Sequence, residues 1–199
     1  MALAQPHGSP LPRAFYERSA LVVARALVGT RLVVARGKSV HVARIVETEA
    51  YCGPTDLACH ARAGITRRTK TLYGPPGHAY VFLIYGMYDC FNVVCFGEGK
   101  GHAVLVRAVE PVTPLEHRTD GPGRLTRALG ITRSHDTADL VGGGAIWLEA
   151  GARVRVAVTP RVGVGYAGAW ADEPWRFVDP KSTHVSKPPA RMIGRGGSG

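Results

Sequence analysis

Short segments rich in β-branched and aromatic residues, separated by glycine and proline, constrain the fold of this chain more than any other feature. Such side chains favour β-strands, and the turn residues between them end each strand after a few positions. The sequence predicts strands at Arg31–Ala35, Val40–Val46, His78–Tyr85, Phe91–Phe96, Ala103–Val109, Ala145–Leu148 and Val154–Val158. Gly37 and Lys38 separate the first two strands and predict a hairpin-like turn.

Two other segments predict helices. Ala14–Leu27 is amphipathic and is followed by Gly29, as expected of a helix that ends at a glycine. Pro122–Leu129 opens with proline and is closed by Gly130. Glycine and proline interrupt Cys52–Gly77, which we expect to be irregular. Few helices, many loops and several antiparallel strands define the α+β class.

The length of 199 residues suits a single domain. Three prolines fall within the first 12 residues and glycine dominates the last six, so we expect flexible tails at residues 1–10 and 191–199 around one domain at residues 11–190. No apolar run approaches the roughly 18 residues that a membrane span needs. The N-terminus lacks the basic start and apolar core of a secretory signal, so we expect a protein inside the cell.

The charge balance is strongly basic. Lys and Arg total 25 against 15 acidic residues, which gives a net charge of +10 and an isoelectric point near 9.9. Such an excess favours nucleic acid, an anionic membrane surface or a polyanionic substrate as partner. The segment Arg62–Lys70 carries four basic residues and no acid, and no acid occurs between Glu17 and Glu47.

Several common catalytic and cofactor motifs are absent from the sequence. It has no glycine-rich phosphate loop, no Ser-His-Asp signature and no His-Glu-x-x-His, and nothing in it requires a cofactor or a metal. The spacing of Cys52, Cys59, Cys90 and Cys95 is not that of a zinc ribbon. We expect these cysteines to be reduced, small buried hydrophobes, and a zinc site that includes His60 is the alternative.

Two carboxylates lie two positions apart in Ile45-Val46-Glu47-Thr48-Glu49. Because side chains alternate along a strand, Glu47 and Glu49 would lie on one face together with Ala43 and Ile45. Desolvation at such a face raises the pKa of a carboxylate, which suits a general base that activates water. The same pattern also fits two surface carboxylates at the end of a strand.

Aromatic residues occur on both faces of the strand predicted over His78–Tyr85. Tyr80, Phe82 and Ile84 would share one face, and Val81, Leu83 and Tyr85 the other. An exposed ring can stack on a nucleobase, which contributes roughly 1–3 kcal/mol, and a ring beside the Gly86 turn can wedge between base pairs. Ordinary aromatic core packing fits the pattern as well.

Asn92 and Arg107 are polar residues within apolar surroundings. Arg107 ends the apolar run Val104–Val106, and a buried arginine must find an anion or several acceptors. Either side chain could point into a pocket, and Arg107 could instead form a structural ion pair, for example with Glu110.

Taken together, these segments resemble one family, the alkyladenine (3-methyladenine) DNA glycosylases. The resemblance runs in order from about residue 11 to residue 178. Its longest matching stretches are Arg44–Tyr51, Gly77–Asn92, Leu105–Pro111 and Arg161–Gly168. It implies a single mixed domain around a curved, mainly antiparallel sheet with a few flanking helices. It also implies a monofunctional DNA glycosylase of base excision repair, which flips alkylated or deaminated purines out of duplex DNA and hydrolyses the N-glycosidic bond.

The resemblance assigns a role to each candidate site residue. Glu49 is the expected general base, and Arg107 helps to hold the attacking water. Tyr51 and His60 form one wall of the flipped-base pocket, with His60 placed to hydrogen-bond the base edge. Phe82 stands where many relatives have a tyrosine that stacks on the other side of the base. Asn92 is expected to reject the 2-amino group of guanine, and the expected DNA contacts are Tyr85 as the minor-groove wedge, Met87, Thr66 and Arg68.

The resemblance also sets expectations about partners. We expect a monomer that binds double-stranded DNA containing damaged purines and no membrane, in the cytoplasm of a bacterium or the nucleus of a eukaryote. No lysine matches a Schiff-base role, so we expect hydrolysis without strand cleavage. Two alternatives remain open: a catalytically silent nucleic-acid-binding module of the same fold, and a hydrolase that uses a Cys/His metal site.

Overall fold

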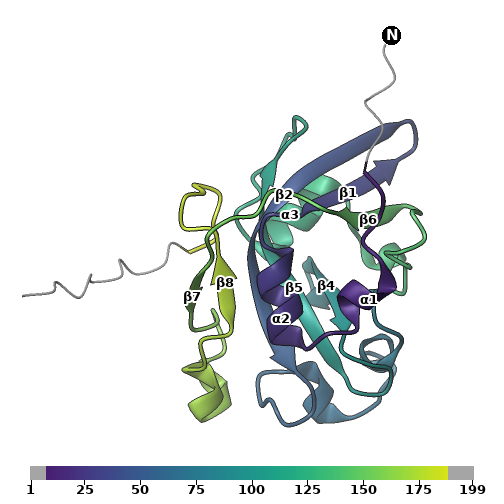
Figure 1. The fold of residues 1–199 in the computed structure, drawn as a ribbon. Helices are drawn as coiled ribbons and strands as arrows, with labels where there is room; N and C mark the ends of the chain where they lie inside the picture. Colours follow the sequence, from purple (N-terminus) through teal and green to yellow (C-terminus); the bar gives the residue numbers. More distant parts are fainter. Residues whose placement is uncertain (1–7, 188–199) are drawn as a thin grey trace, which may run out of the picture.

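One curled antiparallel sheet organises residues 8–187, the part of the chain that this computed structural model describes (Figure 1). Its strands are β1 (Arg31–Arg36), β2 (Ser39–Cys52), β3 (Ala79–Ile84), β4 (Tyr88–Cys95), β5 (His102–Pro111), β6 (Ile146–Glu149), β7 (Ala157–Thr159) and β8 (Arg176–Val178). They run in the order β3-β4-β5-β2-β1-β6, and β8 pairs with both β2 and β7. The α+β class and the curved antiparallel sheet are confirmed.

The helices are few and short. In the described part they are α1 (Arg13–Tyr16), α2 (Ala20–Leu27) and α3 (Pro122–Leu129), with 3-10 helices η1 (His60–Ala63), η2 (Lys70–Tyr73), η3 (Arg133–His135) and η4 (Gly165–Ala171). The prediction for α3 is confirmed to its bounds, with Gly130 left-handed at φ 69°. The single helix predicted over residues 14–27 is wrong. The chain breaks before α2, because the Ser19 side chain accepts a hydrogen bond from the Val22 N–H and caps α2.

The end of the sheet differs from the sequence prediction. The strand expected over residues 154–158 is mostly wrong, because pairing begins only at Ala157. Val154 and Val156 are half-buried against the core without being part of a strand. Their alternation therefore reflects burial and not strand pairing. The sequence pattern also missed β8, a strand of only three residues that pairs with β2 and β7.

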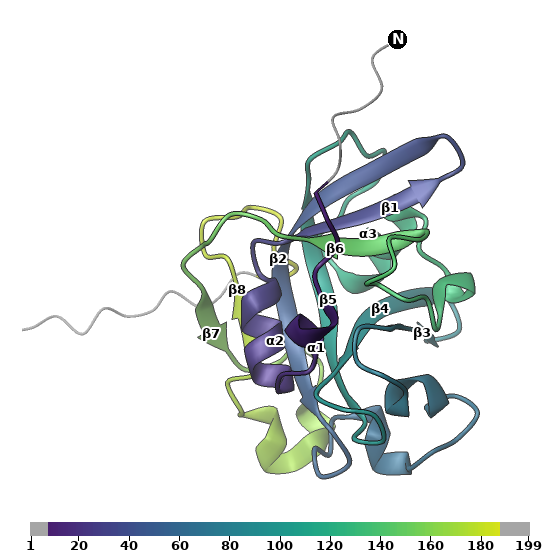
Figure 2. The same cartoon turned by 45° about the vertical axis from the view of Figure 1, so that its right-hand side comes forward.

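The hydrophobic core lies on one face of the sheet. Figures 1 and 2 show α1 and α2 inside the bend of the sheet, where their apolar side chains join the core. Alternate residues of β3, β4 and β5 face this core, namely Val81, Val93, Val104 and Val106. Their strand neighbours Tyr80, Phe82, Asn92, Leu105 and Arg107 line a pocket on the opposite face. The period of two in these strands thus separates core residues from pocket residues.

A β-bulge in β2 changes which residues share a face. The pairing of β2 with β5 shifts register between Ile45 and Glu47 and again before Thr48. Ile45 packs in the core, and the Thr48 hydroxyl donates to a carbonyl of α2, whereas Glu47 and Glu49 point to the pocket side. The expectation that Ala43 and Ile45 share the face of the glutamates is therefore wrong, because the extra residue of the bulge re-aims the strand.

The first described residues are fastened to the sheet. Pro10 forms a β-bridge with Glu149, and the N–H of Leu11 donates to the carbonyl of Leu148 at 2.7 Å. Pro10 is the last residue of the tail expected over residues 1–10, so this end of the expected tail is bound to the sheet. Residues 1–7, residues 188–190 of the expected domain and the tail expected over residues 191–199 lie outside the described range. Within residues 8–187, no helix has the length and apolar character needed to cross a membrane.

Candidate active site

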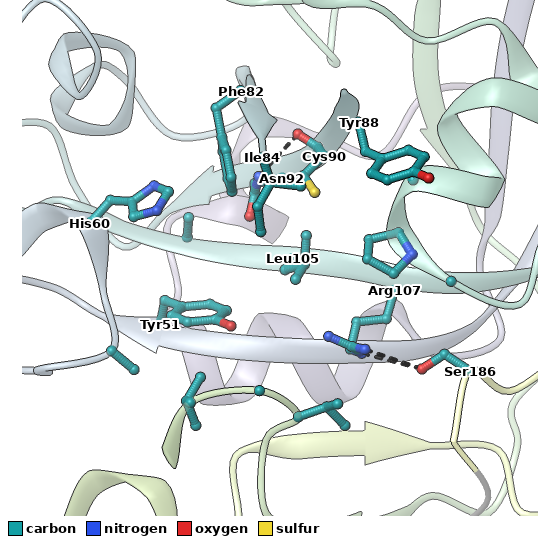
Figure 3. Close-up of a pocket in the computed structure, with 18 of the residues that line it drawn as sticks. Tyr51, His60, Phe82, Ile84, Tyr88, Cys90, Asn92, Leu105, Arg107 and Ser186 are labelled. Atoms are coloured by element: carbon teal, nitrogen blue, oxygen red, sulfur yellow. Dashed lines mark hydrogen bonds between the residues drawn. The ribbon is translucent and has the colours of Figure 1, made fainter. Parts of the chain in front are cut away.

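A cavity of about 700 Å³ opens on the sheet face opposite the core. Strands β3, β4 and β5 form its floor, while the loop after β2, the first turn of α3 and the segment before η4 form its sides (Figure 3). The lining includes six of the residues predicted from the sequence, namely Tyr51, His60, Phe82, Tyr85, Asn92 and Arg107. Aromatic and aliphatic side chains dominate it, which suits a flat, largely apolar ligand with a few polar edges.

Glu49 lies fully buried directly behind the wall of this cavity. Its Oε1 accepts a 2.7 Å hydrogen bond from the backbone N–H of Val162. Its Oε2 accepts from the Tyr51 hydroxyl at 3.0 Å and from an Arg107 nitrogen at 3.4 Å. All three donors line the cavity, although Glu49 itself does not. The alternative of surface carboxylates at a strand end is wrong, because Glu47 and Glu49 both have no exposed area.

The surroundings of Glu49 perturb its acidity in opposite directions. Burial has the largest effect and raises the pKa of the carboxyl group, and the charge of Glu47 adds to the rise. Arg107, the Val162 N–H and the Tyr51 hydroxyl oppose the rise by stabilising the charged form. A desolvated carboxylate that accepts hydrogen bonds on both oxygens is held in place and remains basic, as a general base requires.

Arg107 connects the two buried glutamates. Its Nε donates to Oε1 of Glu47 at 2.9 Å, and a terminal nitrogen reaches Oε2 of Glu49. Burial disfavours the guanidinium charge, but Glu49 and Glu47 outweigh this and raise the pKa of Arg107. The predicted alternative pair with Glu110 is wrong, because Arg44 occupies that carboxylate. Arg107 therefore remains charged beside Glu49.

Aromatic rings face each other across the cavity. Figure 3 shows Tyr51 on one side, and Phe82 and His60 on the other. The rings of His60 and Phe82 lie 4.4 Å apart in an edge-to-face arrangement, and Nδ1 of His60 is 3.1 Å from the Tyr80 hydroxyl. His60 thus lies opposite Tyr51 and does not share its wall, which corrects the expectation. Burial, helped by the charge of Arg68, lowers the pKa of His60 to about 4, so the imidazole is neutral at pH 7.

Asn92 is buried in the floor of the cavity. Its Nδ2 donates to the backbone carbonyls of Tyr80 at 3.0 Å and Cys90 at 3.3 Å. Both bonds tie the side chain to β3 and β4, so the amide cannot turn away from a ligand without losing them. The Asn92 side chain therefore forms a fixed polar group in the floor, beneath the aromatic walls of the cavity.

Sequence reasoning gave no role to Arg161, although it is the first residue of the matching stretch Arg161–Gly168. Two of its nitrogens donate to the fully buried Asp56 carboxylate at 2.6 and 3.0 Å. Its guanidinium also lies 4.9 Å from the ring centroids of both Tyr51 and Trp175. This arginine fixes the Tyr51 ring from behind and anchors the chain just before Val162. Only Asp56, an acidic residue in the segment predicted to be irregular, could have hinted at such a partner.

The tip of the β3–β4 hairpin is exposed beside the cavity. Tyr85 is 83% exposed and Met87 70% exposed, and Tyr85 adopts a left-handed φ of 52°. Arg68 lies with its guanidinium 5.3 Å from the Phe82 ring centroid, and the exposed Thr66 hydrogen-bonds Thr69 at 2.9 Å. Of the four predicted DNA contacts, only Tyr85 lines the cavity, whereas Met87, Thr66 and Arg68 lie outside its lining.

The cysteines are free thiols in the described structure. Cys59, Cys90 and Cys95 are buried and Cys52 is half-buried. Burial raises the pKa of the Cys59 and Cys90 thiols to about 11 and that of Cys52 to about 12. Within residues 8–187 no group of three or more His, Cys, Asp or Glu side chains is arranged to hold a metal ion.

The fold and the cavity together define a class of enzyme. An aromatic-walled cavity binds a flat ring, and a buried carboxylate beside an arginine can activate water next to that ring. The net charge of +10 adds an affinity for polyanions. These features define an N-glycosyl hydrolase that acts on nucleic acid.

Comparisons with known proteins specify the family. Residues 14–183 match the model of the methylpurine-DNA glycosylase family. A candidate 3-methyladenine DNA glycosylase of Myxococcus xanthus is 56% identical, over 91% of this chain and 96% of that protein. Similar candidates from Anaeromyxobacter dehalogenans and Legionella pneumophila are 53% and 46% identical, over 90% and 89% of this chain and 86% and 98% of those proteins. The chain belongs to the methylpurine-DNA glycosylase family, and it is a DNA glycosylase.

Proposed function

We propose that this protein flips alkylated or deaminated purines out of duplex DNA and hydrolyses their N-glycosidic bond, leaving an abasic site. The observation that carries this proposal is the position of Glu49 behind the cavity wall, bonded to Tyr51, Arg107 and Val162. A silent binding module is the weaker alternative, because binding alone requires no desolvated carboxylate.

The recessed position of the carboxylate requires extrusion of the target base. The glycosidic bond of a stacked base is shielded, so an enzyme must rotate the nucleotide into its pocket. The exposed ring of Tyr85 at the hairpin tip is suited to enter the minor groove and fill the gap left behind. Alkylated or mismatched bases stack and pair poorly, so their extrusion costs less, and this difference is one source of selectivity.

Stacking between aromatic rings supports the proposed preference for damaged purines. A base held between Tyr51 and Phe82 contacts two ring faces, which contributes roughly 1–3 kcal/mol for each stacking partner. Alkylation makes a purine electron-poor or cationic, and aromatic faces attract such rings through their quadrupoles. Nδ1 of the neutral His60 faces the Tyr80 hydroxyl, which leaves Nε2 as the ring nitrogen for a hydrogen bond to the edge of the base. Phe82 keeps a stacking face without a hydroxyl group.

Water activation falls to Glu49. A water held near Tyr51, Arg107 and Val162 would lie next to the sugar of a base seated in the cavity. Glu49 accepts a proton from this water, and its charge stabilises the oxocarbenium-like sugar as the bond to the base breaks. The logic is that of carboxylate-assisted glycoside hydrolysis. Arg107 favours the ionised form of Glu49, against the larger effect of burial, and orients the carboxylate.

Asn92 supplies discrimination against undamaged guanine. Its side chain is fixed in the floor by two hydrogen bonds, so it cannot yield to an exocyclic amino group. Hypoxanthine and adenine derivatives carry no 2-amino group and would avoid this clash. The exposed residues Thr66, Arg68 and Met87 would contact the DNA around the flipped nucleotide.

The expected reaction is simple hydrolysis by a monomer. Among residues 8–187, Lys187 is the one lysine that lines the cavity, and its side chain is exposed. Nucleophilic lysines are activated by desolvation or by a neighbouring cation, so exposure does not favour a Schiff base at this position.

A panel of duplexes, each with one lesion, tests the proposal. The panel should contain 3-methyladenine, 7-methylguanine, hypoxanthine and 1,N6-ethenoadenine, with matched single strands and undamaged duplex as controls. We expect free base and an intact abasic strand from at least one lesion duplex, and no covalent adduct after borohydride treatment. Absence of base release from every lesion would contradict the proposed function, and a trapped adduct would contradict simple hydrolysis.

A further inference from the structure

The segment after β8 crosses the polar end of the cavity and contacts its charged residues. The carbonyl of Lys187 accepts a hydrogen bond from Arg176 of β8, and the Ser182 hydroxyl donates to Glu110 of β5 at 3.3 Å. Within this segment, Ser186 and Lys187 line the cavity, with Ser186 next to Arg107 (Figure 3). Ser186 lies outside the residues that match the family model.

Ser186 occupies both oxygens of Glu47. Its backbone N–H donates to Oε2 at 2.6 Å, and its hydroxyl donates to Oε1 at 2.8 Å. The same Oε1 accepts from Nε of Arg107 at 2.9 Å and from Nε of Arg176 at 2.7 Å. Oε1 of Glu47 thus accepts three hydrogen bonds and Oε2 one, and Ser186 supplies a donor to each oxygen.

This arrangement determines which way the Arg107 guanidinium points. An arginine beside a free carboxylate prefers two parallel hydrogen bonds to it. Arg107 bonds Glu47 through Nε, while one terminal nitrogen reaches Glu49 at 3.4 Å and the other reaches the Ser186 hydroxyl at 3.3 Å. The Ser186 hydroxyl thus donates a hydrogen bond to Glu47 and accepts one from Arg107, so it bonds both partners of the Arg107–Glu47 ion pair.

We propose that Ser186 is a positioning residue for catalysis: its hydroxyl holds the Arg107 guanidinium in the orientation that reaches Glu49. This inference rests on the proposed function, because it gives the orientation a role in water activation. Without the hydroxyl, Glu47 Oε1 has one donor fewer and Arg107 one acceptor fewer, so the guanidinium can rotate toward Glu47 and leave Glu49. The effect is on the chemical step, since the hydrogen bonds of Ser186 go to Arg107 and Glu47 and not to the aromatic residues that would stack on the base.

The test is single-turnover release of hypoxanthine from a duplex as protein concentration is raised, for wild type, Ser186→Ala, Ser186→Thr and Ser182→Ala. Ser182→Ala is the matched control, because it removes a hydroxyl from the same segment without touching Arg107 or Glu47. We expect Ser186→Ala to lower the maximal rate about tenfold to a hundredfold, the value for a lost hydrogen bond to charged groups. The half-saturating protein concentration should stay unchanged, Ser186→Thr should restore most of the rate, and Ser182→Ala should match wild type.

Several results would overturn the positioning role. They are a wild-type rate in Ser186→Ala, an equal loss in Ser182→Ala, or a loss that comes with weaker DNA binding or with unfolding measured by circular dichroism. A fully active wild type is required in each case. If wild type releases no base from any lesion, the proposed function itself is wrong, which distinguishes the two failures.

Discussion

The Tyr51 hydroxyl donates a 3.0 Å hydrogen bond to Oε2 of Glu49, and the Tyr51 ring lines the cavity on the same side. One residue therefore belongs both to the wall that would grip the base and to the set of donors that holds the carboxylate. Arg161 fixes the ring from behind, with its guanidinium 4.9 Å from the ring centroid. The proposed base binding and the proposed water activation would thus be coupled through a single side chain.

Tyr51→Phe should shift the pH dependence of base release. The hydrogen bond from Tyr51 lowers the pKa of Glu49 against the larger rise caused by burial, so its loss should raise that pKa further. Because Glu49 must be deprotonated to accept a proton from water, the acid limb of the pH profile of the single-turnover rate should move to higher pH. Tyr166→Phe is the control, since its hydroxyl bonds the Ala58 carbonyl and not Glu49. An unmoved acid limb in Tyr51→Phe would count against Glu49 as the titrating group.

Glu47→Gln should destabilise the protein. Glu47 is fully buried and pairs with Arg107 at 2.9 Å and Arg176 at 2.7 Å. Removing one partner from a buried ion pair leaves uncompensated charge, which costs roughly 3–5 kcal/mol. Urea unfolding followed by circular dichroism measures the loss. An unchanged free energy of unfolding would show that Glu47 has no structural role.

Glu49→Gln should behave in the opposite way. Burial raises the pKa of Glu49 in the folded protein, so the folded state binds this proton more tightly than the unfolded state. Its contribution to stability is therefore greatest at low pH and falls as pH rises above the unfolded pKa. A neutral amide removes that penalty at pH 7, while Arg107 stays paired with Glu47. We expect the Glu49→Gln variant to have a free energy of unfolding no lower than that of the wild type. A clearly lower value would contradict the view that the buried charge of Glu49 costs stability at pH 7.

Tyr85→Gly should separate stability from DNA binding. Tyr85 has a φ of 52°, a conformation that glycine adopts readily and other residues adopt at a cost of about 1 kcal/mol. We expect the thermal midpoint not to fall, while affinity for a lesion duplex drops because the exposed ring is gone. Fluorescence anisotropy measures the affinity, and Tyr85→Phe should bind like wild type. Equal binding by Tyr85→Gly would remove the wedge role.

Asn92→Ala should broaden the range of excised bases. Space opened in the floor would admit the 2-amino group of guanine, so release of guanine from undamaged duplex should rise by roughly tenfold or more. Hypoxanthine carries no 2-amino group, so its release should change little, which makes it the internal control. Parallel changes for both bases would indicate general disturbance of the cavity.

Local signals account for the parts of the fold that the sequence predicts. Proline at the start and Gly130 at the end determine α3, and β-branched or aromatic runs mark most strands. The break before α2 depends on the Ser19 cap, and the face reversal in β2 depends on its pairing with β5. A period-two pattern cannot reveal a bulge, because the extra residue is defined only by the partner strand.

The residues of the candidate site also divide into those that local sequence patterns indicate and those that depend on the folded structure. Local pattern marks the Val46-Glu47-Thr48-Glu49 string and the aromatic strand as candidates, and only the resemblance to the 3-methyladenine DNA glycosylases singles out Glu49 and Phe82 within them. The supports of the site come from far along the chain: Arg161 pairs with Asp56 across 105 positions, and Arg176 with Glu47 across 129. No spacing within the sequence encodes such pairs, so only the folded sheet brings them together.

The most direct test of the account is base release by Glu49→Gln. Single-turnover excision of hypoxanthine and of 1,N6-ethenoadenine should be measured beside the affinity for the same duplexes. A general base contributes roughly 10²–10⁴-fold, so we predict a rate lower by at least that order with lesion binding largely intact. Excision at the wild-type rate by Glu49→Gln would contradict the assignment of Glu49 as the base that activates water.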